Sequence, residues 1–271
     1  MERLLGFLAV QVHDLIHKFF TADGQLLLNI LLHLGTLVAV FVAYWRDICD
    51  MVMELIHGVN DLAHGTTPRQ VPPARRLILL IIVGTLPLFA VLPIHKKVQA
   101  LSNNMIFIGA ALVVTGFLLF ACDLVRKGRK TERNATLADV LVVGVGQAIA
   151  TMPGISRSGM TITTGCFMGF ERKFAVRFSF LLSIPAVLGA NILSLKDAIE
   201  TGIVWAEVPM YLVGVVTAAV VGYVCIRLLR MVAEKGRFGA FAYYCWAAGL
   251  LTLLLNAIKI GIASPEMIRE W

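Results

Sequence analysis

Residues 153–161 carry the side chains of this chain that are best suited to chemistry, in the order Pro-Gly-Ile-Ser-Arg-Ser-Gly-Met-Thr. Arg157 supplies a forked guanidinium that matches the oxygens of a phosphate group. A helix starting near Gly159 would direct the positive end of its dipole into the same place. Glycines let backbone N–H groups approach a ligand and serine hydroxyls add donors; these residues are Gly154, Gly159, Ser156 and Ser158. The stretch therefore predicts a cradle for a phosphate or diphosphate group.

The composition places this cradle in a membrane protein. Of the 271 residues, 58% are hydrophobic and 15% are charged, and the mean hydropathy is +0.82. A water-soluble domain carries about 25% charged residues, so a soluble enzyme, a disulfide scaffold and a disordered tail are excluded. The formal net charge is +7, and the basic residues lie between apolar runs without interleaved aromatic residues. This pattern favours basic membrane loops over a nucleic-acid surface. The five cysteines form no CxxC pair and are interpreted as buried hydrophobic residues.

The apolar runs predict an all-α polytopic fold with six spanning helices and one re-entrant helical hairpin. A seventh apolar block, residues 137–170, is interrupted by proline, glycine, serine and arginine, which a lipid-facing helix would not accept in mid-span. We therefore expect two short helices that meet at a polar loop. The six spans are predicted at residues 26–45, 77–92, 105–124, 174–195, 208–226 and 238–262.

Loop charge predicts that the hairpin turns back instead of crossing the membrane. Four loops are rich in lysine and arginine, and they all share the cytoplasmic side only if the hairpin returns to the side from which it came. If the hairpin crossed, the later loops would reverse against the rule. The four loops are residues 46–76, 125–136, 171–173 and 227–237.

A weak internal repeat predicts inverted-repeat architecture within one integral membrane domain, residues 1–271. An offset of 150 aligns residues 28–47 with residues 178–197, and three spans and one hairpin separate equivalent points. Residues 1–104 would be an incomplete first repeat, and residues 105–271 the second repeat with the re-entrant loop at 137–170. A chance match of short apolar stretches is the alternative.

Arg157 needs a partner at membrane depth, because an isolated charge there costs about 2.5 kcal/mol or more. No aspartate or glutamate lies between Val140 and Phe170, so the sequence favours an anionic ligand. The alternative is that Arg157 snorkels or pairs with a distant carboxylate while the glycines only allow close helix packing. Gln147 is commonly an interhelical hydrogen-bonding group in such a position, and we also count it, with Thr161, among the candidate substrate-binding residues.

Three stretches resemble the undecaprenyl-diphosphatase family, also called the bacitracin-resistance family: residues 31–37, 146–161 and 178–185. The resemblance implies an integral membrane hydrolase of the bacterial inner membrane. Such an enzyme converts C55 isoprenyl diphosphate to the monophosphate that carries peptidoglycan precursors. It also implies that Arg157 binds the diphosphate, with Ser156 and Ser158 beside it, and we take these three as the candidate catalytic residues. The candidate substrate-binding residues are Gly154, Gly159, Thr161 and Gln147.

The resemblance further implies a divalent cation, magnesium or calcium, and here the chain departs from the family. The family carries an N-terminal E/QxxxE pattern and a PxSSxGH loop with metal-binding, nucleophilic and acid-base duties, which the sequence lacks. Residues 1–6 resemble the segment after that loop, so we expect a start codon placed too late or a truncated chain, with doubtful activity. Metal ligands are therefore not identified, and no catalytic role is transferred to Glu2, His13, Asp14 or His17.

Two other functions stay open at this stage. A lipid-phosphate flippase or small-anion transporter would use the same inverted repeat, broken helix and anion cradle. A non-catalytic remnant that packs with a partner is the third interpretation. The expected partners are an isoprenyl diphosphate lipid and membrane lipids, with no nucleic acid, and a homodimer is left open.

Overall fold

A computed structural model describes residues 22–65, 71–125, 127–201, 208–235 and 238–267. Throughout these ranges the regular elements are helical, apart from one isolated bridge between Lys130 and Phe170. The all-α expectation is confirmed. The helices are α2 (Ala22–Ala43), α3 (Trp45–Ala63), α4 (Pro73–Phe89), η1 (Leu92–Ile94), α5 (His95–Ala100), η2 (Leu101–Asn103), α6 (Met105–Leu124), α7 (Leu137–Ile149), α8 (Arg157–Phe167), α9 (Arg172–Thr201), α10 (Val208–Lys235) and α11 (Gly239–Met267).

Five described segments are long and apolar enough to cross a membrane. A sixth span requires Ile30–Ala43 and Trp45–Asp61 to count together as one broken helix pair. The chain is therefore a multi-pass membrane protein. Five of the six predicted spans are met by single described helices, and the predicted span at residues 26–45 falls on the first helix of this pair. The five are Pro73–Ile94, Met105–Leu124, Arg172–Ile192, Tyr211–Lys235 and Gly239–Ile258.

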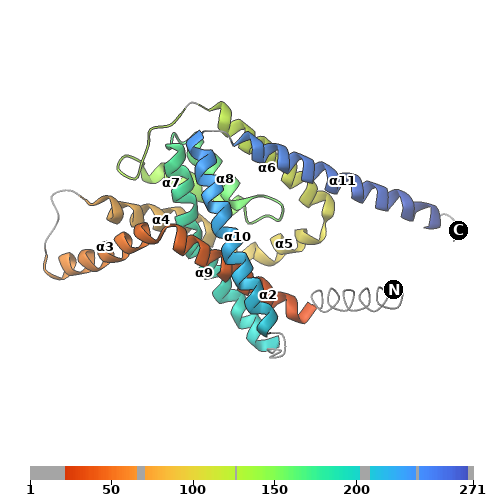
Figure 1. Ribbon diagram of the computed structural model, residues 1–271, viewed down its shortest axis with the longest axis horizontal. Coiled ribbons are helices and arrows are strands. Elements are labelled where there is room, and N and C mark those ends of the chain that lie inside the picture. Colours follow the sequence, from red (N-terminus) through yellow and green to blue (C-terminus); the bar gives the residue numbers. More distant parts are fainter. Residues whose placement is uncertain (1–21, 66–70, 126, 202–207, 236–237, 268–271) are drawn as a thin grey trace, which may run out of the picture. The chain divides into compact units, whose positions relative to one another are not determined.

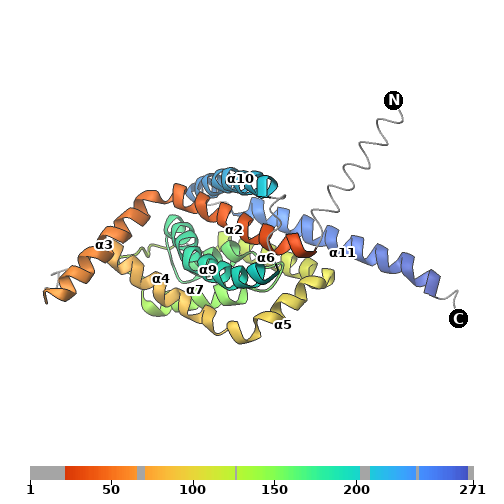
Figure 2. The same cartoon turned by 90° about the horizontal axis from the view of Figure 1, so that it is seen from below.

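The chain forms two compact units, one made of residues 1–45 and 183–227 and the other of residues 46–182 and 228–271. In the first unit, α2 packs closely on α10, as Figure 2 shows. A Cβ added at Gly35 would lie 2.6 Å from the carbonyl oxygen of Val215, and one added at Gly222 would lie 3.1 Å from Cβ of Ala39. Small residues thus let the two backbones approach, as is common between membrane helices.

In the second unit, α6 and α11 form an antiparallel pair (Figure 1). Gly249 packs against the carbonyl oxygen of Gly109, and Gly116 packs against the ring of Trp246, so small residues again set a short separation. Asp123 closes one end of the pair, because its carboxylate accepts hydrogen bonds from the backbone N–H groups of Phe238 (2.9 Å) and Gly239 (2.7 Å). These bonds satisfy N–H groups at the start of α11.

The hairpin is supported in this unit by α4, which packs along α7. The carbonyl oxygen of Gly84 lies against the Cα position of Gly144, where a side chain would not fit. Buried Leu77 and Leu80 continue the α4 face, and buried Val140 and Val143 continue the α7 face.

The expectation that residues 46–76 form a loop is wrong for most of the segment, because helix α3 extends over Trp45–Ala63. Its acidic residues recur at helical spacing on the side turned toward the protein, where Glu54 and Asp61 each lie 2.7 Å from Arg75. Its large apolar residues point away from the protein, with Val59 62% exposed. An amphipathic helix with this orientation suits a lipid neighbour better than water. The outward residues are Val52, Leu55, Ile56 and Val59.

Candidate active site

One lysine joins the segments that lead into and out of the re-entrant hairpin, which we call its neck. Lys130 Nζ lies 2.8 Å from both carboxylate oxygens of Asp139, in the first turn of α7. The backbone N–H of Lys130 donates to the carbonyl oxygen of Gly169 (3.0 Å), and its carbonyl oxygen accepts from the N–H of Glu171 (2.8 Å). Both ends of the hairpin therefore meet at Lys130, which confirms that the block turns back and does not cross.

The two hairpin helices begin at capping residues that the sequence supplies. Thr136 and Asp139 form a capping box at the start of α7, which satisfies N–H groups on the first turn. Ser156 is the N-cap of α8, where its Oγ accepts a hydrogen bond from the N–H of Gly159 at 3.2 Å. Residues 150–156 join the helices, so the prediction of two short helices meeting at a polar loop is confirmed.

The polar loop packs on the middle of α6. Gly154 has a φ of +88°, and a Cβ there would lie 2.8 Å from the carbonyl oxygen of Ile108. The Thr115 hydroxyl donates a hydrogen bond to the carbonyl oxygen of Gly154 (3.5 Å) and accepts one from the backbone N–H of Ser156 (3.3 Å). Because Thr115 is near the centre of a 20-residue spanning helix, the loop lies at membrane depth.

Arg157 occupies the first position of α8 and is partly buried. Among the residues that the structure describes, no carboxylate or carbonyl oxygen forms an ion pair or hydrogen bond with its guanidinium. The first N–H groups of a helix lack intrahelical partners, so the start of α8 adds positive potential beside the guanidinium. An unpaired cation at the positive end of a helix is an arrangement that binds an anion.

The other predicted residues differ in their surroundings. Thr161 is only 2% exposed and its hydroxyl lies 2.6 Å from the hydroxyl of Ser179, so it joins α8 to α9. Gln147 is 1% exposed, and both polar atoms of its amide lack a partner in the described chain. Ser158 is partly buried, and Gly159 packs against the Ser156 side chain.

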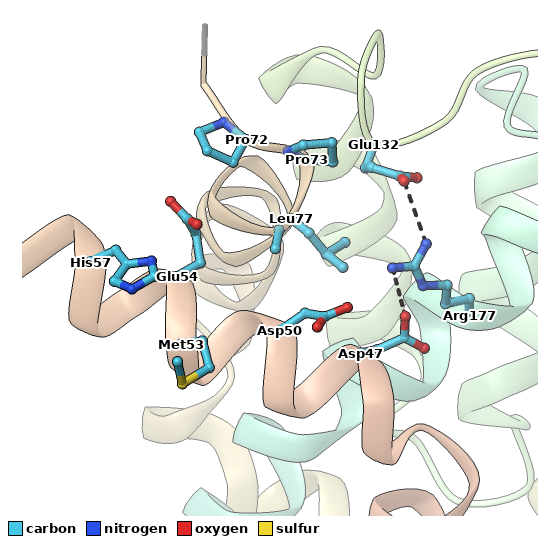
Figure 3. A pocket seen from close by; sticks show the side chains of 11 residues that line it. Asp47, Asp50, Met53, Glu54, His57, Pro72, Pro73, Leu77, Glu132 and Arg177 are labelled. Atoms are coloured by element: carbon cyan, nitrogen blue, oxygen red, sulfur yellow. Dashed lines mark hydrogen bonds and ion pairs between the residues drawn. The ribbon is translucent and has the colours of Figure 1, made fainter. Parts of the chain in front are cut away.

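A second polar feature ties the hairpin neck to α3, α4 and α9 (Figure 3). Arg177 lies 2.8 Å from Asp47 and 3.5 Å from Glu132, and the three side chains line a pocket of about 450 Å³. Arg76 donates to the carbonyl oxygen of Ala135 at 2.9 Å. Segments 46–76 and 125–136, which were predicted to share one side of the membrane, are thus brought together.

Several residues that build the site carried no local signal in the sequence. Thr115 and Ser179 lie inside apolar runs, yet their hydroxyls hold the loop and α8. Lys130 was counted only as loop charge, although it closes the hairpin. A polar residue in a spanning helix is costly unless it has a partner. Applied to Thr115 and Ser179, this general rule could have marked them as residues with a partner, but it does not say which partner.

The hairpin does not fit a divalent cation with its own side chains. Residues 140–170 contain no carboxylate, and among the described residues no group of three or more histidine, cysteine, aspartate or glutamate side chains is arranged to hold a metal. Magnesium and calcium prefer several oxygen ligands, usually including carboxylates. The loop instead offers N–H, hydroxyl and guanidinium donors, which suit an anion.

Fold and site together define a polytopic helical membrane protein whose re-entrant loop carries an unpaired arginine and oriented N–H and hydroxyl donors. The chain matches the family model described as bacitracin resistance protein BacA over residues 9–251. It is 35% identical over 250 residues to the undecaprenyl-diphosphatase of Methanosphaera stadtmanae, covering 90% of this chain and 89% of that protein. The undecaprenyl-diphosphatase of Alkaliphilus metalliredigens is 37% identical over 254 residues (93% and 91%), and that of Desulforapulum autotrophicum is 39% identical over 244 residues (89% and 88%). The chain belongs to the bacitracin resistance protein BacA family.

Proposed function

We propose that this protein is an undecaprenyl-diphosphate phosphatase of the bacterial inner membrane, which hydrolyses C55 isoprenyl diphosphate to the monophosphate and so recycles the carrier lipid of peptidoglycan synthesis. The unpaired guanidinium of Arg157, at the start of α8 and at mid-membrane depth, is the observation that carries this proposal. The names of the family's relatives agree with it. They do not favour the flippase or anion transporter alternative.

In this proposal the lipid tail lies among apolar helices and the diphosphate enters the loop. Arg157 neutralises charge on the phosphate oxygens, and the N–H groups at the start of α8 add oriented donors. Water attacks the terminal phosphorus, the bond from that phosphorus to the bridging oxygen breaks, and the isoprenyl monophosphate leaves with that oxygen. Ser158 and Ser156 border the same loop and are the proposed catalytic neighbours.

The hairpin supplies binding and charge neutralisation, while the residue that activates water must come from elsewhere. Residues 140–170 contain no carboxylate and no histidine, and the amide of Gln147 cannot act as a general base. The buried, unpartnered amide of Gln147 instead suits hydrogen bonding to a polar ligand, and Gly154 and Gly159 keep the loop backbone accessible. Thr161 acts in this scheme by holding α8 in place. The divalent cation and the homodimer stay proposals that no described residue supports.

The test compares Arg157→Ala and Arg157→Lys with the parent chain in bilayer nanodiscs. We expect Arg157→Ala to lower phosphate release from C55 isoprenyl diphosphate by about a hundredfold or more, the range for losing one oriented donor. Arg157→Lys should recover part of that loss, because it keeps the charge without the fork. Arg133→Ala, which removes an exposed arginine of the 125–136 segment, is the matched control and should leave the rate unchanged.

A binding measurement keeps the test informative if the parent chain turns over slowly. A lipid methylenediphosphonate cannot be hydrolysed, so its dissociation constant reports the cradle alone. Arg157→Ala should raise this dissociation constant at least tenfold, while Arg133→Ala should not. Equal binding by Arg157→Ala and the parent would contradict the proposed role of the loop.

A further inference from the structure

A basic pocket lies at the neck of the hairpin, apart from the Arg157 loop. It has a volume of about 370 Å³, and its walls come from the segment before α7, the start of α9 and the end of α10. Four basic side chains and two carboxylates line it, which leaves a surplus of two positive charges. The lining residues are Lys127, Gly128, Arg129, Glu171, Arg172, Lys173, Ala233 and Glu234.

Two of the four cations are already neutralised within the protein. Lys173 lies 3.2 Å from Glu234, and Arg172 lies 3.9 Å from Asp123 and donates to the carbonyl oxygen of Cys122 at 3.3 Å. Lys127 and Arg129 are exposed, and neither forms an ion pair or hydrogen bond with any residue that the structure describes. The first turn of α9 adjoins the same pocket and adds N–H groups without intrahelical partners. The pocket therefore has unused capacity for an anion.

The pocket lies at the ends of spanning helices, where phospholipid headgroups would meet the protein. Two of its walls are the ends of spanning helices, since α9 begins at Arg172 and α10 ends at Lys235, and the third wall, residues 127–129, follows soon after the end of α6 at Leu124. Apolar side chains are exposed on the same helix ends, with Leu124 74% and Met231 49% exposed. A ligand with a phosphate headgroup and acyl chains would contact both the basic pocket and the exposed apolar side chains, whereas free phosphate would contact only the basic pocket.

We propose that the pocket formed by Lys127, Arg129, Arg172 and Lys173 binds the phosphate headgroup of an anionic membrane phospholipid. Basic pockets between membrane helices are known to bind such headgroups. The Lys130 neck, with its bonds to Gly169 and Glu171, lies next to this pocket in the chain, so a bound lipid would join the neck of the hairpin to the membrane interface. The site does not depend on the proposed hydrolase activity.

The experiment titrates the purified full chain in mild detergent with phosphatidylglycerol or phosphatidylcholine and counts bound lipid by native mass spectrometry. The test variant is Lys127→Gln with Arg129→Gln. One cation near a membrane surface contributes about fivefold in binding, so the double variant should bind phosphatidylglycerol about 30-fold more weakly. Phosphatidylcholine binding should not change. The matched control is Arg46→Gln with Lys97→Gln, which removes the same charge from exposed residues outside the pocket and should retain parental affinity.

Two further measurements separate a lost charge from disturbed folding and a lipid ligand from a free anion. Lys127→Arg with Arg129→Lys keeps both charges and should bind phosphatidylglycerol like the parent, which separates lost charge from disturbed folding. Millimolar inorganic phosphate at constant ionic strength should fail to displace the lipid. Displacement by phosphate would assign the pocket to a free anion and overturn the lipid proposal, as would equal phosphatidylglycerol binding by the Gln double variant and the parent.

Discussion

Thr115, near the centre of α6, accepts a hydrogen bond from the backbone N–H of Ser156 at 3.3 Å. The two residues are 41 positions apart in the sequence. Ser156 is also the N-cap of α8 and directly precedes Arg157. One hydroxyl on a spanning helix therefore sets the depth at which α8 begins, and with it the position of the guanidinium. The position of the Arg157 guanidinium therefore depends on Thr115, although the two side chains form no hydrogen bond with each other.

Thr115→Val should lower activity while the protein stays folded. Valine keeps the shape of the 1% exposed threonine but leaves the N–H of Ser156 without its acceptor, which costs about 1–3 kcal/mol when the group is buried. A shift of the loop by about 1 Å can cost about a hundredfold in rate. Phosphate release from C55 isoprenyl diphosphate should fall, and Thr115→Ser, which restores the hydroxyl, should recover it. Parental activity in Thr115→Val would show that the bond does not position the loop.

Gly154→Ala should destabilise the loop more than the same change at Gly65. Both glycines have a positive φ, +88° and +66°, which costs an alanine about 1–2 kcal/mol. At Gly154 the new Cβ would also lie 2.8 Å from the carbonyl oxygen of Ile108, whereas nothing lies within 4 Å at Gly65. The extra crowding should add about 1–3 kcal/mol. Thermal unfolding of both variants in detergent measures the difference, and equal midpoints would contradict it.

The spans and the hairpin could be predicted because lipid imposes simple rules on a chain. A long apolar run must form a helix, and a run broken by Pro153 and Arg157 must turn within protein. Helix α3 was missed because Asp47, Glu54 and Asp61 give its segment the composition of a loop. Their partners, Arg75 and Arg177, lie far along the chain.

The ligand cradle was predictable in residue type but not in its support. Gly154, Ser156 and Arg157 stand together in the sequence, so local chemistry already favoured an anion. The contacts from Thr115 and Ser179 join α6 and α9 to the hairpin, and only the folded chain shows them. The inverted repeat and its division at residue 104 remain predictions.

The neck of the hairpin should lose stability as the pH falls. Burial by itself would raise the pKa of Asp139, but hydrogen bonds from Lys130 and Thr136 outweigh it and hold that pKa below its ordinary value. A lowered folded-state pKa means that the ionised carboxylate stabilises the fold. This contribution is fully present above the unfolded pKa of about 3.9 and declines as the pH falls toward the folded pKa.

Asp139→Asn removes this titration and supplies its control. Below about pH 4, the thermal midpoint of the parent should fall more steeply than that of Asp139→Asn, because the amide has no proton to gain. The variant should be less stable than the parent at neutral pH, where the ion pair with Lys130 at 2.8 Å is lost. Identical slopes in the two proteins would mean that another carboxylate governs the acid response.

The buried hydroxyls of Thr161 and Ser179, 2.6 Å apart, should behave as a coupled pair in a double-mutant cycle. Thr161→Val and Ser179→Ala should each destabilise the chain, since each leaves a buried hydroxyl or carbonyl with fewer partners, and the double variant should cost less than their sum by about 1 kcal/mol. Thr163→Val, two residues along α8, is the control: its hydroxyl is buried without a partner in the described chain, so the change should be neutral or stabilising. Denaturation midpoints in detergent give the coupling energy, and strict additivity would show that α8 is not held to α9 through this bond.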